Sequence, residues 1–231
     1  HLAESDQQSA TWRDDFIRTY LHRDIPSFGS SVPAETLRRF WTMLAHVQGG
    51  LHNAAALAKS LSVEGKWIAR YLDLLVDLLL VRRLPPYFAN TRKRLVKSPK
   101  IYIRDSGVIH SLLGLRDTEA VLGHPVSGAS WEGFVIDNLI AAAGDRRTPY
   151  YYRTEDGAEV DLVFERGGRV EMAVEIKRSS APVLSRGFHS AYDVLKPKEA
   201  YLLHGGNEAW PIAKGISAIG LQNLLKHLAE K

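Results

Sequence analysis

The chain has 231 residues, 45% of them hydrophobic, and a formal net charge of +4 at pH 7. This length suits one large or two small domains, and the mild positive charge permits a nucleic-acid partner without requiring one. Cysteine is absent, which excludes disulfides and thiolate metal sites and fits a reducing cytoplasm, where we expect the protein. The most apolar stretch, residues 68–81, contains charged residues and is too short to cross a bilayer, so no membrane partner is expected.

Apolar residues at helical spacing predict a helix-rich first part of the chain. Helices are expected over residues 12–22, between Pro33 and Gly49, from the capping residue Asn53 to a turn at 61–62, and over residues 68–79. Two strands, LLVRRL (79–84) and KIYIRD (100–105), flank a basic loop that contains prolines. Two helices and such a hairpin predict a winged helix, which a short helix around residues 106–115 would cover.

The segment 116–130 is polar and contains glycine, which is typical of a domain connection, so a boundary is expected near residue 125. The pattern beyond it is mixed. Strands are expected at 150–153, 159–165, 170–177 and 199–204, and helices at 131–143, 184–195 and 216–229. We therefore predict an α/β fold, α+β overall, with a helical domain over residues 1–125 and a mixed-sheet domain over residues 126–231.

Three charged residues, Asp161, Glu175 and Lys177, lie inside strands that should feed a core. A charge that is removed from water without a partner costs roughly several kcal/mol or more. A charged residue inside a buried strand therefore usually has a specific role. Glu175 and Lys177 share one face of their strand because side chains alternate. A simpler interpretation is a structural ion pair between these two residues.

The turn between the two strands decides whether Asp161 joins them. A two-residue turn at Gly167 and Gly168 sets Asp161 opposite Val174 and places Glu175 on the other face. A three-residue loop sets Asp161 opposite Glu175. A shared site therefore requires the second register, or a bulge that restores it.

Glu132 is a further acidic candidate. It precedes Val135, Ile136 and Leu139 by three, four and seven residues, so it lies along the apolar face of its helix. Converging carboxylates repel one another, and a divalent cation relieves this repulsion. Oxygen ligands favour Mg²⁺ or Mn²⁺, held by Glu132, Asp161 and Glu175. Lys177 would then orient the attacking water and stabilise charge on phosphorus, which makes Asp161, Glu175 and Lys177 the candidate catalytic residues.

The order Glu132, Asp161, Glu175-Ile176-Lys177 resembles the E…D…E-x-K signature of the PD-(D/E)XK nuclease superfamily. The chain also resembles the C-terminal half of a family of bacterial and archaeal AAA-type ATPases, in which a P-loop domain precedes a winged-helix part and an uncharacterised nuclease-like domain. The similar phrases span nearly the whole chain: IRTYLHRDI, KRLVKSPKIYIRDSGV, WEGFVIDNL, YYRTEDGAEVDLVF and AVEIKRS.

This resemblance implies a restriction-endonuclease-like sheet and an ATPase domain as a partner. No G-x-x-x-x-G-K-[ST] motif occurs in the sequence. We therefore interpret the chain as a fragment without ATPase activity of its own, to which ATP is relevant only through the missing N-terminal domain.

Basic residues supply candidate contacts to nucleic acid. The second helix of the winged-helix segment carries Lys66 and Arg70, although its acidic residues would repel phosphates. The basic loop and its flanks carry Arg82, Arg83, Arg92, Lys93, Arg94, Lys97 and Lys100, of which Arg92, Lys93, Arg94 and Lys97 are the main candidates. A solvated loop, or a surface that packs against the absent ATPase domain, is the alternative.

The expected function is DNA binding by the C-terminal region of an ATPase, with Mg²⁺-dependent cleavage of phosphodiester bonds as its candidate activity. The alternative is a non-catalytic DNA- or protein-interaction module whose carboxylate cluster is a relic or a structural ion pair. Enzyme activity is left open between these two hypotheses.

Overall fold

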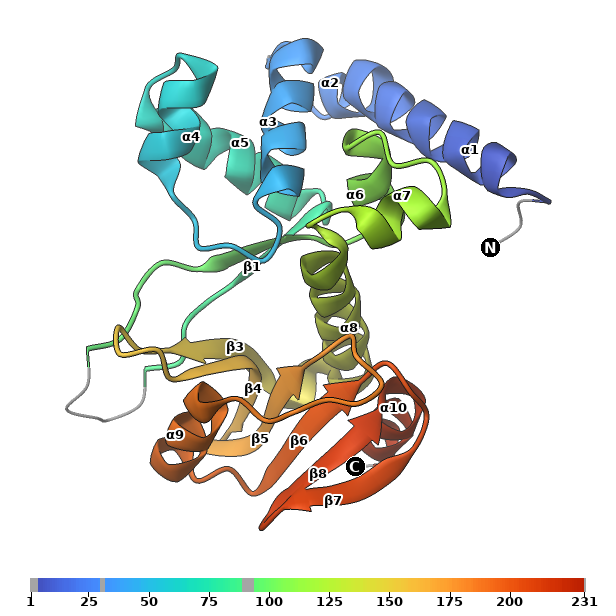
Figure 1. Ribbon diagram of the computed structural model, residues 1–231. Helices are drawn as coiled ribbons and strands as arrows, with labels where there is room; N and C mark the ends of the chain where they lie inside the picture. Colours follow the sequence, from blue (N-terminus) through green and yellow to red (C-terminus); the bar gives the residue numbers. More distant parts are fainter. Residues whose placement is uncertain (1–3, 30–31, 89–93, 231) are drawn as a thin grey trace. The chain divides into compact units, whose positions relative to one another are not determined.

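The computed structural model describes residues 4–29, 32–88 and 94–230, which form two compact units (Figure 1). The first unit comprises the described residues up to Arg83 together with Ile101–Gly133. The second comprises those of Leu84–Lys100 and those from Phe134 on. The first unit is mainly helical and the second contains a mixed sheet, which confirms the predicted α/β class.

The first unit is built from helices around one apolar core. Helix α1 (Asp6–Thr19) continues through a π-helical turn (Tyr20–Asp24) into α2 (Ile25–Ser27), and is followed by α3 (Ala34–His46), α4 (Ala54–Leu61), α5 (Gly65–Asp77), α6 (Ser106–Leu112) and α7 (Thr118–Gly123). Strands β1 (Val81–Leu84) and β2 (Lys100–Ile103) form a two-stranded sheet. The apolar faces of α3 and α5 meet in the core, where Phe40, Trp41, Ile68, Leu72 and Leu75 are buried.

The predicted short helix, the longer helix that follows it and the two strands are present, as α4, α5, β1 and β2. Asn53 caps α4, because its side chain accepts a hydrogen bond of 3.0 Å from the Ala56 N–H. Ser62 ends α4 in a left-handed conformation, with φ 56°, which turns the chain into α5. Helix α8 (Ser127–Ala143) starts four residues before the predicted Trp131.

The second unit contains a six-stranded sheet in the order β3-β4-β5-β6-β8-β7. Its strands are β3 (Thr148–Arg153), β4 (Glu159–Arg166), β5 (Arg169–Ile176), β6 (Glu199–His204), β7 (Ala209–Ala213) and β8 (Ile216–Gly220). Strands β5, β6 and β8 are parallel, and the remaining pairs are antiparallel. A 3₁₀ turn (Gly144–Arg146) precedes β3, and helices α9 (Arg186–Leu195) and α10 (Leu221–Ala229) complete the unit.

One expectation about these elements was wrong. Residues 216–220 are not the start of the last helix but strand β8, which pairs with β6 and β7. The connection at 116–130 contains a short helix of its own, α7, which Asp117 caps by accepting a hydrogen bond of 2.8 Å from the Ala120 N–H. The last residues of this connection belong to α8.

The described part of the basic loop lies along the edge strand β3. The Tyr87 N–H donates to the Tyr151 carbonyl (2.7 Å), and the Val96 N–H donates to the Arg153 carbonyl (3.1 Å). This pairing covers backbone groups that an edge strand would otherwise expose. Of the described helices, none has the length and apolar character needed to span a bilayer.

Candidate carboxylate site

A bulge sets the register of β4 and β5. The turn at Gly167 and Gly168 has two residues, both at positive φ, and Arg166 pairs with Arg169. The register then shifts between Phe164 and Glu165, so that Leu162 pairs with Val174. One position further along, Asp161 comes opposite Glu175. The predicted requirement for a restoring bulge is confirmed, because Glu171 is the extra residue.

Asp161, Glu175 and Lys177 line one polar pocket of about 250 Å³, together with Glu159, Ser185 and two glycines. Val163 and Ala173, two positions from Asp161 and Glu175 on the same strands, pack in the core beneath α9. The two carboxylates therefore lie on the α9 face of the sheet, at its polar end. The structure brings together three of the four residues of the predicted site.

Glu175 and Lys177 form an ion pair, with Nζ 3.0 Å from Oε1. The Glu175 side chain is 5% exposed and that of Lys177 is 41% exposed. The Ser185 N–H, at the N-cap of α9, lies 3.4 Å from Oε2 of Glu175 as a long hydrogen-bond donor. Glu175 is thus fixed inside the pocket, whereas the Lys177 ammonium lies at its solvent side and can reach a ligand.

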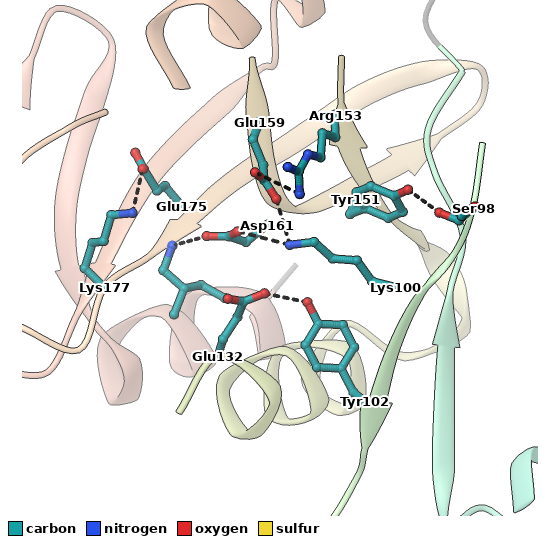
Figure 2. A network of polar contacts seen from close by, with 11 residues as sticks. Ser98, Lys100, Tyr102, Glu132, Tyr151, Arg153, Glu159, Asp161, Glu175 and Lys177 are labelled. Atoms are coloured by element: carbon teal, nitrogen blue, oxygen red, sulfur yellow. Dashed lines mark hydrogen bonds and ion pairs between the residues drawn. The ribbon is translucent and has the colours of Figure 1, made fainter. Parts of the chain in front are cut away.

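Asp161 is held through both carboxylate oxygens. Oδ2 accepts a hydrogen bond of 2.9 Å from the Ile176 N–H on β5. Oδ1 lies 3.5 Å from Nζ of Lys100, which also lies 2.9 Å from Oε1 of Glu159 (Figure 2). Arg153 lies 3.7 Å from Oε2 of Glu159. These contacts fix the Asp161 carboxylate at the pocket wall.

Lys100 was not predicted as part of this site. It was named among the basic residues that could contact phosphates, but the residue is 4% exposed and its ammonium lies between Glu159 and Asp161. The ammonium also lies 5.7 Å from the centre of the Tyr151 ring. Burial raises the pKa of Tyr151, and the positive charges of Lys100 and Arg153 oppose that shift. The available sequence signal was a lysine at the first position of β2, directly before the apolar residues 101–103.

Glu132 belongs to the first unit, where the Tyr102 hydroxyl donates a hydrogen bond to its Oε1 (Figure 2). Val135, Ile136 and Leu139 are buried, which confirms that the apolar face of α8 follows the predicted stripe. The participation of Glu132 in the carboxylate site stays a prediction.

The candidate nucleic-acid contacts belong to different units. In the first, Lys66 lies 2.7 Å from Glu64, and the Arg70 guanidinium lies 4.9 Å from the centre of the Trp67 ring. In the second, Arg94 and Lys97 are exposed, and Arg94 lies 4.0 Å from Glu155. Arg92 and Lys93 lie outside the described residues. Contact of these side chains with DNA is untested.

The described residues contain no group of three or more His, Asp and Glu side chains arranged to hold a metal ion. Two carboxylates nevertheless suffice for Mg²⁺, which commonly keeps several waters and uses one or two protein carboxylates plus substrate phosphate. Asp161 and Glu175 offer such oxygens in one pocket. The residues of the second unit therefore fit this mode of binding, in which Mg²⁺ would share the two carboxylates with the ammonium groups of Lys100 and Lys177.

Comparison with known families assigns the chain to domains rather than to an activity. A family model described as Domain of unknown function (DUF8612) matches residues 1–119. The chain belongs to the DUF8612 family. A second model, Domain of unknown function (DUF4143), matches residues 127–224, which include Asp161, Glu175 and Lys177.

Two similar curated proteins are uncharacterized proteins of Mycobacterium bovis and Mycobacterium tuberculosis. Each is 45% identical over 223 residues, covering 96% of this chain and 50% of the relative. The DUF8612 chain thus spans about half the length of the curated relatives it matches. No solved structure matches it.

Proposed function

We propose that the second unit binds DNA and hydrolyses phosphodiester bonds in the presence of Mg²⁺ or Mn²⁺. The observation that carries this proposal is the bulged register, which brings Asp161 and Glu175 to one face beside Lys177. A bulge that re-aims side chains at the rim of a sheet is a common feature near active sites.

Each residue has a role in this proposal. Asp161 and Glu175 bind the ion, which supplies positive charge at the phosphate and lowers the pKa of a bound water. Lys177, at the solvent side of the pocket, orients the water and stabilises the negative charge that develops on the phosphate oxygens. The Ile176 N–H and Lys100 hold Asp161 in place and act as positioning groups.

The test is incubation with plasmid, linear and branched DNA, with and without Mg²⁺ or Mn²⁺. Asp161→Asn and Lys177→Met are the site variants, and Asp193→Asn, an exposed residue of α9, is the matched control. Metal-dependent cutting that is lost in both site variants and kept in the control supports the proposal. Cutting that persists in Asp161→Asn contradicts it.

A non-catalytic interaction module is the second candidate, and a specific observation favours it. The carboxylates already face cations, Glu175 with Lys177 at 3.0 Å and Glu159 with Lys100 at 2.9 Å. Such ion pairs can have a purely structural role, in which they fix one conformation of the protein. This candidate expects a salt-sensitive gel shift that survives Asp161→Asn, without any cleavage.

We also propose that the chain acts in the cytoplasm beside an AAA-type ATPase domain. The sequence phrases that resemble this ATPase family support the idea, as does the 50% coverage of the curated relatives. The winged-helix interpretation of α4, α5, β1 and β2 belongs to the same proposal. Co-purification of the chain with the other half of a full-length relative, produced separately, is the test.

A further inference from the structure

A second pocket lies at the opposite end of the β4–β5 hairpin from the carboxylate site. We call it the turn pocket. It has a volume of about 750 Å³, compared with about 250 Å³ for the carboxylate pocket. Its lining includes Tyr87, Arg166, Arg169, Glu171, Lys196 and Lys198, which all belong to the second unit. No role was predicted for this pocket or its residues.

The turn pocket is strongly positive. Arg166, Arg169, Lys196 and Lys198 are exposed and come from two segments, the β4–β5 turn and the connection from α9 to β6. Among the described residues that line the pocket, Glu171 alone is acidic. Its carboxylate lies 2.6 Å from Arg147, which is 1% exposed, whereas Arg166 is 3.9 Å away. The buried arginine is therefore the closer partner of this acid and Arg166 a more distant one, so the four exposed cations leave the pocket with an excess of positive charge.

The backbone at Lys196 supports a role for its side chain. Lys196 ends α9 at φ +46°, and its N–H donates to the Tyr192 carbonyl at 2.9 Å. Glycine is the usual residue at such a left-handed helix end, because a Cβ is unfavourable there. A lysine at this position therefore carries a conformational cost, and the same residue lines the positively charged turn pocket.

Tyr87 adds an aromatic group to the pocket. Its ring is partly buried and packs edge-on against Tyr150, with 5.5 Å between ring centres. Cations that track a backbone and a ring on which a base can stack are the combination by which proteins bind single strands without sequence preference.

We propose that the turn pocket binds the phosphate backbone of a single-stranded nucleic acid, with Tyr87 stacking on a base. From Asp161 to Arg166, strand β4 advances five residues, or about 17 Å at ~3.3 Å per residue. In this proposal, a nucleic-acid strand bound in the turn pocket extends over this distance to the carboxylate site. This placement relative to cleavage rests on the proposed function, whereas the binding itself does not.

The experiment measures the affinity of a fluorescein-labelled single-stranded DNA by anisotropy, in EDTA, at several salt concentrations. The pocket variant is K196Q/K198Q. The matched control is K214Q/K226Q, which removes two exposed lysines from elsewhere in the second unit. Two lost phosphate contacts should lower the slope of log K against log salt by about 1.4, at ~0.7 per contact. The pocket variant should bind at least about tenfold more weakly at low salt, and the control should match the wild type.

Lys196→Gly separates folding from binding. This substitution removes the charge and also relieves the left-handed backbone, so the variant should melt at or above the wild-type temperature and still bind more weakly. The proposal is overturned if the wild type does not bind the strand, if K196Q/K198Q and K214Q/K226Q behave alike, or if Lys196→Gly binds with wild-type affinity.

Failure of the proposed binding can be distinguished from failure of the proposed cleavage. Binding in EDTA requires no metal and no reaction. If Asp161→Asn abolishes cleavage while K196Q/K198Q binds the single strand normally, the proposed role of the turn pocket is wrong and the proposed cleavage site is supported. If K196Q/K198Q loses affinity for the single strand and no condition yields cleavage, the proposed role of the turn pocket is supported and the proposed cleavage activity is wrong.

Discussion

Asp161 and Glu175 come opposite each other across β4 and β5 because one bulged residue offsets the two-residue turn at Gly167 and Gly168. Without the extra residue, Glu175 and Lys177 would project from the face opposite Asp161. The juxtaposition of the two carboxylates is thus a property of the strand register, and it is the geometric basis for the predictions about a metal ion.

Mg²⁺ should stabilise the protein through Asp161 and Glu175. A ligand that binds only the folded state raises stability by RT ln(1 + [L]/Kd), about 2.7 kcal/mol at 100 times Kd. We expect millimolar Mg²⁺ to raise the melting temperature of the wild type, and this shift to disappear in Asp161→Asn. Lys177→Met should keep the shift or enlarge it, because the ammonium that pairs with Glu175 is gone, and should still lack cleavage. A full shift in Asp161→Asn would argue against the site.

Lys100 should be required for stability at neutral pH. Its ammonium is buried between Glu159 and Asp161, so Lys100→Met removes the cation that these two carboxylates share. Removing one member of a buried pair typically costs about 3–5 kcal/mol; because Glu159 is partly exposed and Arg153 remains near it, we expect about 2–3 kcal/mol in urea unfolding at pH 7.

Neutralising the two acids identifies the origin of that cost. In a Glu159→Gln/Asp161→Asn background the ammonium faces no negative charge from these two residues, so Lys100→Met should cost much less than it does in the wild type. Lys97→Met, at an exposed residue of the same segment, should change stability by less than about 0.5 kcal/mol. An equal loss in both backgrounds would mean that packing of the lysine stem, not its charge, is what matters.

The sequence was informative where the evidence is local. Helical spacing located α3 and α5, and alternation in β4 and β5 placed Glu175 beside Lys177. It left two registers open, because the choice depends on a bulge at Glu171 that carries no local signal. The role of Lys100 was missed because its partners lie 59 and 61 residues further along the chain.

The error at residues 216–220 has a different cause. Strand β8 runs directly into α10, and Gly220 is both the last residue of the strand and the N-cap of the helix. No intervening turn residues mark the change of structure, so the apolar residues of both elements formed one continuous helical pattern. Pairing with β6 and β7, which is long-range information, decides that the first five residues are extended.

Gly187 should be required for the packing of α9 beside the carboxylate pocket. A Cβ built at this residue would lie 2.5 Å from the Gly157 carbonyl oxygen and 3.4 Å from the Glu159 nitrogen. These are backbone atoms, which cannot move aside as the end of a flexible side chain can. We expect Gly187→Ala to cost about 1–3 kcal/mol in urea unfolding. Gly128→Ala in α8, where nothing lies within 4 Å, is the matched control and should be neutral or stabilising by up to about 1 kcal/mol. Equal stability of the two variants would contradict this close approach.

Tyr201 should make the protein sensitive to alkali. Burial raises its pKa to about 12, and the nearby Glu199 carboxylate, which accepts a hydrogen bond of 3.1 Å from the phenol, adds to the shift. The ordinary pKa of tyrosine is about 10, so the folded state keeps this proton to higher pH than the unfolded state. The resulting stabilisation is complete below about pH 10 and is lost as the pH rises toward 12.

The variants Tyr201→Phe and Glu199→Gln separate the two causes of this shift. Tyr201→Phe has no phenol to ionise, so its stability should fall less steeply than that of the wild type over this alkaline range. Glu199→Gln keeps the burial but removes the negative charge, so tyrosinate absorbance should show Tyr201 ionising at lower pH than in the wild type, though still above the ordinary value. If Glu199→Gln titrates as the wild type does, burial alone accounts for the raised pKa; if Tyr201→Phe unfolds with the same alkaline profile, another group causes the loss of stability.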